Sequence, residues 1–191
     1  MPTPPRLLIV AHDVVQPRMA GPGIRALELA RALAPELPVA LAVPHAAPAA
    51  KEPFPLLPYE PGRWESLRPA ASRAGALLVN PFTLAAFPAL AALGTPLAVD
   101  LYDPFPLENL QPLRGAPPAE RAAVQARDLA LLRHALAVGD FFLCANGRQR
   151  DAWLGALMAA GRVNPATADA DPTLASLLAE VPFGLPDAPF A

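Results

Sequence analysis

Short hydrophobic runs recur along the chain without the polar alternation of a strand that has one solvated face. The strongest lie at 6–11, 75–80, 96–101 and 140–145, and two weaker ones lie at 38–43 and 180–183. Unbroken runs of this length are typical of strands that are buried on both faces of a parallel sheet. We therefore predict a strand at each of these positions.

Helical patterns occupy the intervals between the hydrophobic runs. In 24–34 apolar residues recur every three or four positions, whereas Arg25, Glu28 and Arg31 share another face. The stretch 44–62, rich in proline and alanine, predicts a loop or an irregular edge strand. The remaining patterns predict helices at 118–138 and 147–160 and shorter ones at 83–93, 104–110 and 172–179.

Strands that alternate with helices predict an α/β fold, because parallel neighbours need a crossover connection that a helix usually provides. We predict a single doubly wound Rossmann-like domain over residues 1–191, with a mostly parallel sheet flanked by helices. In such sheets ligands bind beyond the carboxyl ends of the strands, where the strand order reverses. Polar residues that directly follow a hydrophobic run are therefore the candidates for a binding site.

Composition and charge narrow the functional classes. The formal net charge is −2 and the basic residues are scattered along the chain, which disfavours a nucleic-acid partner. The single cysteine, Cys144, has no partner for an internal disulfide, and no histidine or cysteine spacing suggests a metal site. The apolar run from Leu7 to Ala11 is too short for a signal-peptide core or a transmembrane segment. We therefore expect a cytoplasmic setting.

A pair of glycines opens the first predicted helix, in the stretch AHDVVQPRMAGPGIRALELARAL (11–33). GPGIRA matches the G-x-G-x-x-A pattern of dinucleotide sites, but about ten residues separate it from the strand, and no acidic residue ends the second strand. A helix N-terminus favours an anion, and Gly23 without a Cβ allows close approach. Alternatively, Pro22 and Gly23 only shape the turn. The spacing leaves both explanations open.

Four segments occur in an order that is familiar from one enzyme family. They are HDVVQPRMAGPGIRALELARAL (12–33), VDLYDPFPLENL (99–110), GDFFLCANGRQRDAWLGAL (139–157) and VPFGLP (181–186). The first resembles the glycine loop and first helix of the amino-terminal domain in family-four retaining glycosyltransferases of the GT-B architecture. The next two are similar to the fourth-strand and fifth-strand segments of that domain, and the last to its passage into the second domain.

The resemblance implies one half of a two-domain enzyme that transfers a sugar from a nucleotide sugar to an acceptor with retention. This chain would be the acceptor-side half, the donor-binding C-terminal domain would be missing, and the fragment alone would be inactive. The implied partners are the nucleotide sugar and a carbohydrate or lipid-linked acceptor, and no other cofactor is implied. Peripheral contact with the inner face of a membrane stays open. Gly21 and Gly23 match the positions from which backbone amides approach the donor phosphate.

The other candidates for substrate binding lie in segments that follow hydrophobic runs. Carboxylates there can bind sugar hydroxyls through charge-assisted hydrogen bonds, and an arginine can bind an anionic group. Structural explanations stay open as well, because Asp103 before Pro104 fits an N-cap and Asn146 with Gln149 fits a capping pair. His12 at a strand end either helps to bind the acceptor or is simply hydrogen-bonded. The candidates are Asp13, Arg18, Asp100, Asp103 and Asn146.

Two other functional classes remain compatible with the sequence. One is a non-catalytic Rossmann-like module that binds a nucleotide or an anion, and the other is an oxidoreductase with a nucleotide cofactor. The sequence assigns no catalytic nucleophile, because no G-x-S-x-G motif is present. It also leaves the sugar, the acceptor and the oligomeric state open.

Overall fold

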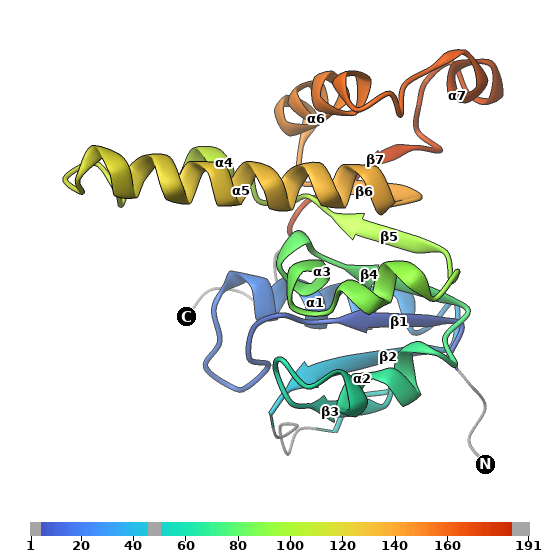
Figure 1. Cartoon of the computed structure of the whole chain (residues 1–191). Coiled ribbons are helices and arrows are strands. Elements are labelled where there is room, and N and C mark those ends of the chain that lie inside the picture. Colours follow the sequence, from blue (N-terminus) through green and yellow to red (C-terminus); the bar gives the residue numbers. More distant parts are fainter. Residues whose placement is uncertain (1–4, 46–50, 185–191) are drawn as a thin grey trace.

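A seven-stranded parallel sheet forms the centre of the protein, in the order β3-β2-β1-β4-β5-β6-β7 (Figure 1). The computed structural model describes residues 5–45 and 51–184. The strands are β1 (Leu7–Val10), β2 (Val39–Pro44), β3 (Leu56–Tyr59), β4 (Ala76–Val79), β5 (Leu97–Asp100), β6 (Phe141–Cys144) and β7 (Leu178–Glu180). The predicted α/β fold with a parallel sheet flanked by helices is confirmed.

Helices connect the strands. They are α1 (Gly21–Leu33), α2 (Trp64–Ala71), α3 (Pro81–Ala86), the 3-10 helix η1 (Pro88–Ala92), α4 (Phe105–Glu108), α5 (Pro118–Val138), α6 (Gly147–Ala159) and α7 (Pro165–Ala170). The sequence patterns predict all of these except α2 and α7. Pro69 in the interior of α2 disfavours a helix there, and α7 has only six residues.

The predicted helix at 172–179 is wrong, and the last strand begins at Leu178 and not at residue 180. The carboxylate of Asp171 explains the difference, because it accepts the N–H groups of Thr173 (2.9 Å) and Ser176 (2.8 Å) and so holds a turn. Leu174 has a φ of 57°, which lies outside the helical region. The stretch 44–62 contains the edge strand β3, as predicted.

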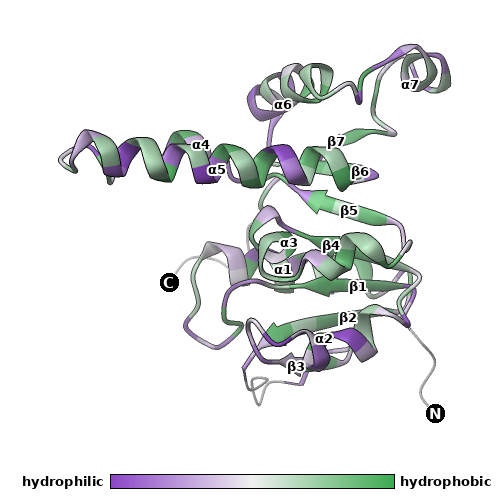
Figure 2. Cartoon of the chain, in the orientation of Figure 1, coloured by the Kyte–Doolittle hydropathy of each residue, from purple (hydrophilic) through white to green (hydrophobic). Residues whose placement is uncertain are grey.

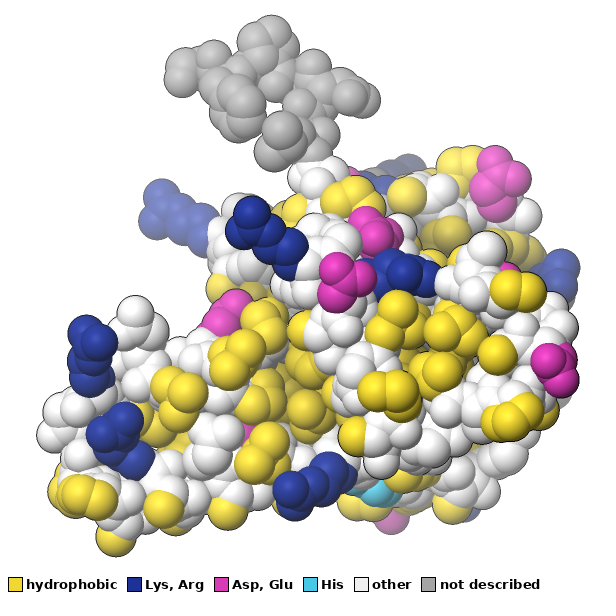
Figure 3. All heavy atoms as spheres, turned by 90° about the horizontal axis from the view of Figure 1, so that it is seen from above, with side chains coloured by type: hydrophobic (Ala, Val, Ile, Leu, Met, Phe, Trp, Pro, Cys, Tyr) yellow, Lys and Arg dark blue, Asp and Glu magenta, His cyan; other side chains and the backbone are white. Residues whose placement is uncertain are grey.

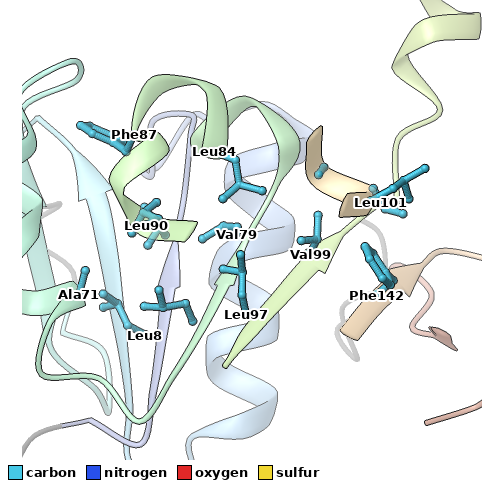
Figure 4. Packing of buried hydrophobic residues seen from close by; sticks show 14 of the residues in the cluster. Leu8, Ala71, Val79, Leu84, Phe87, Leu90, Leu97, Val99, Leu101 and Phe142 are labelled. Atoms are coloured by element: carbon cyan, nitrogen blue, oxygen red, sulfur yellow. The ribbon is translucent and has the colours of Figure 1, made fainter. Parts of the chain in front are cut away.

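Two hydrophobic clusters flank the sheet, because successive residues of a strand point to opposite faces. One cluster joins Leu8 and Val10 to α2, α3, α5 and α6. Figure 4 shows part of this cluster, with Ala71 of α2 close to Leu8 and Leu84 of α3 close to Val79. The other joins Ile9 and Ala11 to α1, which is the only helix in it among the residues that the structure describes. In Figure 2 the central strands are mostly hydrophobic, whereas hydrophilic and hydrophobic residues alternate along α5 and α6.

The topological switch point of the sheet lies between β1 and β4. Ile9 of β1 pairs with Leu41 of β2 on one side and with Leu78 of β4 on the other. The chain first builds β2 and β3 on one side of β1 and then returns to build the other strands on the opposite side. Ligands of doubly wound sheets bind at such a point, beyond the carboxyl ends of the strands.

Helix α4 and the first half of α5 project beyond the carboxyl ends of the strands (Figure 1). No residue of 118–127 is buried, whereas Leu132 and Leu136 in the second half of α5 pack on the sheet. Viewed from above, hydrophobic side chains gather in a hollow between this projecting arm and the rest of the domain (Figure 3). Leu107 on α4 is 66% exposed. The arm thus borders the edge where a ligand is expected.

Asn146 is the N-cap of α6, as the capping interpretation of the sequence predicts. Its Oδ1 accepts the N–H of Gln149 at 3.0 Å, while the Gln149 side chain accepts the N–H of Ala145 at 2.8 Å. We expect Asn146→Ala to lower the free energy of unfolding by about 1 kcal/mol, because it leaves an amide of the first turn without its partner. Urea denaturation measures the loss. Asn146→Asp, which keeps the acceptor, should restore most of it, and equal losses in both variants would contradict the capping role.

Candidate functional site

A small cavity lies at the switch point of the sheet. Its volume is about 30 Å³, and its walls come from the ends of β1, β4 and β5 and from the first turns of α1. This volume is large enough for one water molecule. The polar residues in the wall are His12, Arg25, Asn80, Asp100 and Tyr102.

Arg25 and Asp100 form a buried ion pair in the wall of this cavity. The Nε and Nη2 atoms of Arg25 donate to the two carboxylate oxygens of Asp100 at 2.6 and 2.9 Å. The two residues are 3% and 8% exposed. Burial raises the pKa of the Asp100 carboxyl above its ordinary value, whereas the hydrogen bonds from Arg25 lower it. The two-point contact shows that both Asp100 oxygens are already occupied within the domain.

The guanidinium of Arg25 also contacts residues from two other parts of the chain. It lies 5.0 Å from the ring centre of Tyr102 and 4.9 Å from that of Phe183, both within the range of cation–π contacts. Its Nη1 donates to the backbone carbonyl of Val181 at 2.9 Å. Arg25 therefore connects α1 with the end of β5 and with the segment that follows β7.

Sequence reasoning missed Arg25 as a site residue, because its place among charged residues on one helix face suggests solvent exposure. Glu28 and Arg31 on the same face are indeed exposed. The available signal was the position of Arg25 in the first turns of a helix that starts at the carboxyl edge. An acidic residue, Asp100, ends a buried strand at that same edge.

His12, at the end of β1, lies against Asn80 at the end of β4 and stacks on Phe82, with 5.6 Å between the ring centres. Asn80 is the N-cap of α3, and its Oδ1 accepts the N–H of Thr83 at 2.8 Å. The amide nitrogen of Asn80 therefore faces Nδ1 of His12, so Nδ1 accepts and the ring proton is on Nε2. Burial lowers the pKa of His12, although Asp13 opposes this, and the ring stays neutral at pH 7.

The glycine pair has two different surroundings. A Cβ on Gly23 would lie less than 3.0 Å from the carbonyl oxygen of Val14, and 3.3 Å from Sδ of Met19. The loop that follows β1 thus folds back over Gly23 and fills the space beside it. Gly21 is exposed, and apart from its chain neighbours no atom of residues 5–45 and 51–184 lies within 4 Å of the corresponding position. The close approach at Gly23 is made by the protein's own backbone, whereas Gly21 faces open space.

The N-terminus of α1 has no side-chain cap and no acidic residue in its first turn. The first N–H groups of a helix have no partner within the helix, and they carry partial positive charge. This end of α1 is thus chemically suited to an anion that reaches it past Gly21.

The remaining candidates are spread around the carboxyl edge. Oδ1 of Asp13 accepts the N–H of Val14 at 2.7 Å, so this carboxylate holds the turn after β1. Arg18 is exposed on the loop before α1. Neither residue lines the cavity at the switch point, and Asn146 is engaged in capping α6. The structure brings Asp100 to the cavity and leaves these three residues outside it.

Asp103 does not cap a helix, so that prediction is wrong. Helix α4 begins at Phe105, and Pro104 occupies the N-cap position. Among the residues that the structure describes, Oδ1 of Asp103 is buried and has no hydrogen-bond partner. Burial and the neighbouring carboxylate of Glu108 raise the pKa of Asp103 to about 6. Asp103, at the base of the projecting arm, therefore keeps its proton to a higher pH than an ordinary aspartate but is mostly ionised at pH 7.

The raised pKa predicts a specific pH dependence of stability. An acid with a folded pKa of about 6 and an ordinary pKa of 3.8 stabilises the fold below pH 4, and this contribution is lost as the pH rises to 6. We expect Asp103→Asn to match the wild type at pH 4 and to be more stable by about 1 kcal/mol at pH 8, a reduced value because the carboxyl is half exposed. Urea denaturation at both pH values measures this. Glu108→Gln should make the stability of the protein less dependent on pH. If the stability difference between the wild type and Asp103→Asn were the same at pH 4 and pH 8, the raised pKa of Asp103 would be contradicted.

With this geometry established, known proteins offer a comparison. No protein-family model and no curated protein matches the chain. Within 5–45 and 51–184, no group of three or more histidine, cysteine, aspartate or glutamate residues is placed to hold a metal ion. None of the helices in the same ranges is long and apolar enough to cross a membrane. The functional assignment must therefore come from the chemistry of the site.

Proposed function

We propose that this domain is the acceptor-side half of a retaining glycosyltransferase that uses a nucleotide-sugar donor. The observation that carries the proposal is the uncapped N-terminus of α1, which opens through Gly21 at the switch point of a parallel sheet. An anionic diphosphate is the ligand chemistry that such a helix end favours. The family resemblance of the glycine loop supports the same assignment.

In this proposal the backbone amides at the start of α1 face the diphosphate of the donor. They offset the negative charge that develops on the phosphate as the sugar leaves. The projecting arm and Asp103 hold the acceptor close to the sugar, which removes much of the entropic cost of bringing the reactants together. Donor recognition is assigned to a second lobe. No protein nucleophile is proposed.

The end of β2 disfavours the oxidoreductase alternative. Dinucleotide-binding domains carry an acidic residue near that position to bind the ribose. Here β2 ends at Pro44, and His45 follows with a left-handed φ of 65°. Neither side chain is a carboxylate that could accept hydrogen bonds from the ribose hydroxyls.

One observation favours the non-catalytic module as the second candidate. The cavity at the switch point has a volume of only about 30 Å³, and the carbonyl of Val14 fills the space beside Gly23. A site limited to the α1 N-terminus would bind a phosphate group without holding an acceptor.

Titration of isotopically labelled protein, followed by nuclear magnetic resonance, tests the proposal. Nucleoside diphosphate sugars should shift the amide signals of Gly21 and Ile24, and simple glycosides should shift signals of α4. Gly21→Ala keeps the amide and should retain the response. Gly21→Pro removes the amide at a helix position that tolerates proline, and should lose it.

The other outcomes contradict the transferase proposal. Shifts with inorganic phosphate but none with glycosides would favour the non-catalytic module. Tighter binding of NAD than of any nucleoside diphosphate sugar would favour the oxidoreductase.

A further inference from the structure

The segment that follows β7 returns to the carboxyl edge on the side of α1. Val181 donates its N–H to the carbonyl of Cys144 at 2.7 Å, and its own carbonyl accepts from Arg25 at 2.9 Å. Two residues later the ring of Phe183 covers the Arg25 guanidinium and meets the ring of Tyr102 edge to face, with 5.4 Å between centres. The Arg25 side chain therefore contacts Val181–Gly184 at two points, the carbonyl of Val181 and the ring of Phe183.

Arg25 lies between two hollows of the molecule. On one side is the cavity at the switch point, with His12 and Asn80 in its wall. On the other is a groove of about 230 Å³ between α1 and Val181–Gly184, lined by Ile24, Leu29 and Phe183 among others. Arg25 contributes to both walls, so a movement of its guanidinium changes the shape of both.

We propose that Arg25 is a positioning residue that couples the candidate site to the segment Val181–Gly184. Asp100 fixes the guanidinium by two hydrogen bonds, and the fixed guanidinium holds Val181 by its carbonyl and Phe183 by its ring. The placement of the segment and the shape of the site then depend on each other. The coupling goes beyond the proposed function and does not depend on which ligand the site binds.

Hydrogen bonds from α6 hold the residues after β5, which border the candidate site, in place. The backbone carbonyl of Tyr102 accepts the side-chain amide of Gln149 at 2.8 Å, and that of Leu101 accepts the indole N–H of Trp153 at 2.8 Å. Helix α6 thus anchors the residues that follow β5. Among the contacts described for Val181–Gly184, those of Arg25 are the ones that reach across from α1, so this segment is the part that should respond to a change at Arg25.

Hydrogen–deuterium exchange of the whole chain tests the coupling without reference to activity. Arg25→Lys keeps the positive charge but loses the planar fork that binds two oxygens at once. We expect amide exchange in 178–184 to rise by about tenfold or more, while exchange in β1 and β2 stays as in the wild type. Phe183→Leu removes the exposed ring and should raise exchange in the same segment to a smaller extent.

The matched control is Arg31→Lys, in the same helix. Arg31 also makes a two-point contact, to Glu52 at 2.6 and 2.9 Å, but its own side chain is 45% exposed and its hydrogen-bond partners are Glu28 and Glu52, not residues of 178–184. The variant Arg31→Lys should leave amide exchange in 178–184 unchanged. Unchanged exchange in 178–184 for Arg25→Lys, or an equal rise in every strand, would overturn the proposal, since an equal rise reports only a loss of global stability.

Discussion

Arg25→Met should lower the free energy of unfolding by about 4 kcal/mol at pH 7, because it leaves the Asp100 carboxylate buried without its partner. Asp100 is 8% exposed, and both of its oxygens accept hydrogen bonds from Arg25 alone among the side chains that the structure describes. Burial already raises its pKa. Without Arg25 the carboxyl must either stay charged while buried or take up a proton. Urea denaturation measures the loss.

A double variant separates the cost of an unpaired charge from the value of the pair. Arg25→Met combined with Asp100→Leu removes both charges and fills the wall with apolar atoms of similar size. We expect it to recover most of the stability lost in Arg25→Met, because buried ion pairs are often no more stabilising than well-packed apolar residues. Arg63→Met is the exposed control, because both side chains of the Arg63–Glu60 pair are 64% exposed, and it should cost little stability. A loss of that same small size in Arg25→Met would contradict the buried-pair explanation.

If the double variant recovers its stability, the ion pair is not needed for the fold. Its retention would then reflect what Arg25 does at the edge of the sheet, where it meets Tyr102, Val181 and Phe183. The free energy of unfolding therefore reports on the ion pair of Arg25 with Asp100, whereas local amide exchange reports on the contacts of Arg25 with Val181 and Phe183. The double variant should be stable and still show fast exchange in 178–184.

The sheet could be predicted from the sequence because its signal is local. Runs such as LLIVA and FFLCA have no polar residue, and only strands covered on both faces accommodate them. Parallel pairing then follows from the intervening helices. The order of the strands places Ala11 and Asn80 side by side at the switch point, and this could be expected from the fold class alone.

The contacts of the candidate site could not be predicted, because they join residues far apart in the sequence. Arg25 and Asp100 are 75 positions apart, and Arg25 and Val181 are 156 apart. A charged residue on an amphipathic helix is usually solvated, and the helical period by itself does not distinguish Arg25 from Arg31. The N-cap role of Asn146 was predictable since its partners lie within four residues. The turn at Asp171 has a local cause too, but helical periodicity does not detect it.

Gly23→Ala should lower the free energy of unfolding by about 3 kcal/mol or more, the second of the two largest effects. The new Cβ would overlap the carbonyl oxygen of Val14, which is backbone and has little freedom to move. Relief requires the loop after β1 to shift away from α1, and the same loop carries Val15, which is 2% exposed in the second hydrophobic cluster. Urea denaturation again gives the magnitude.

Gly21→Ala is the matched control, two positions earlier in the same helix. Among the described residues other than its chain neighbours, no atom lies within 4 Å of its added Cβ. The following Pro22 disfavours a helical residue that carries a Cβ, which offsets the higher helix propensity of alanine. The loss of stability in Gly21→Ala should therefore be much smaller than in Gly23→Ala. If both variants were equally stable, the loop would not be packed against Gly23. The space beside Gly23 would then be free for a ligand, and the glycine pair as a whole would face the site. If only Gly23→Ala is destabilised, Gly23 serves the packing of the loop, and the approach of an anion to α1 is left to Gly21.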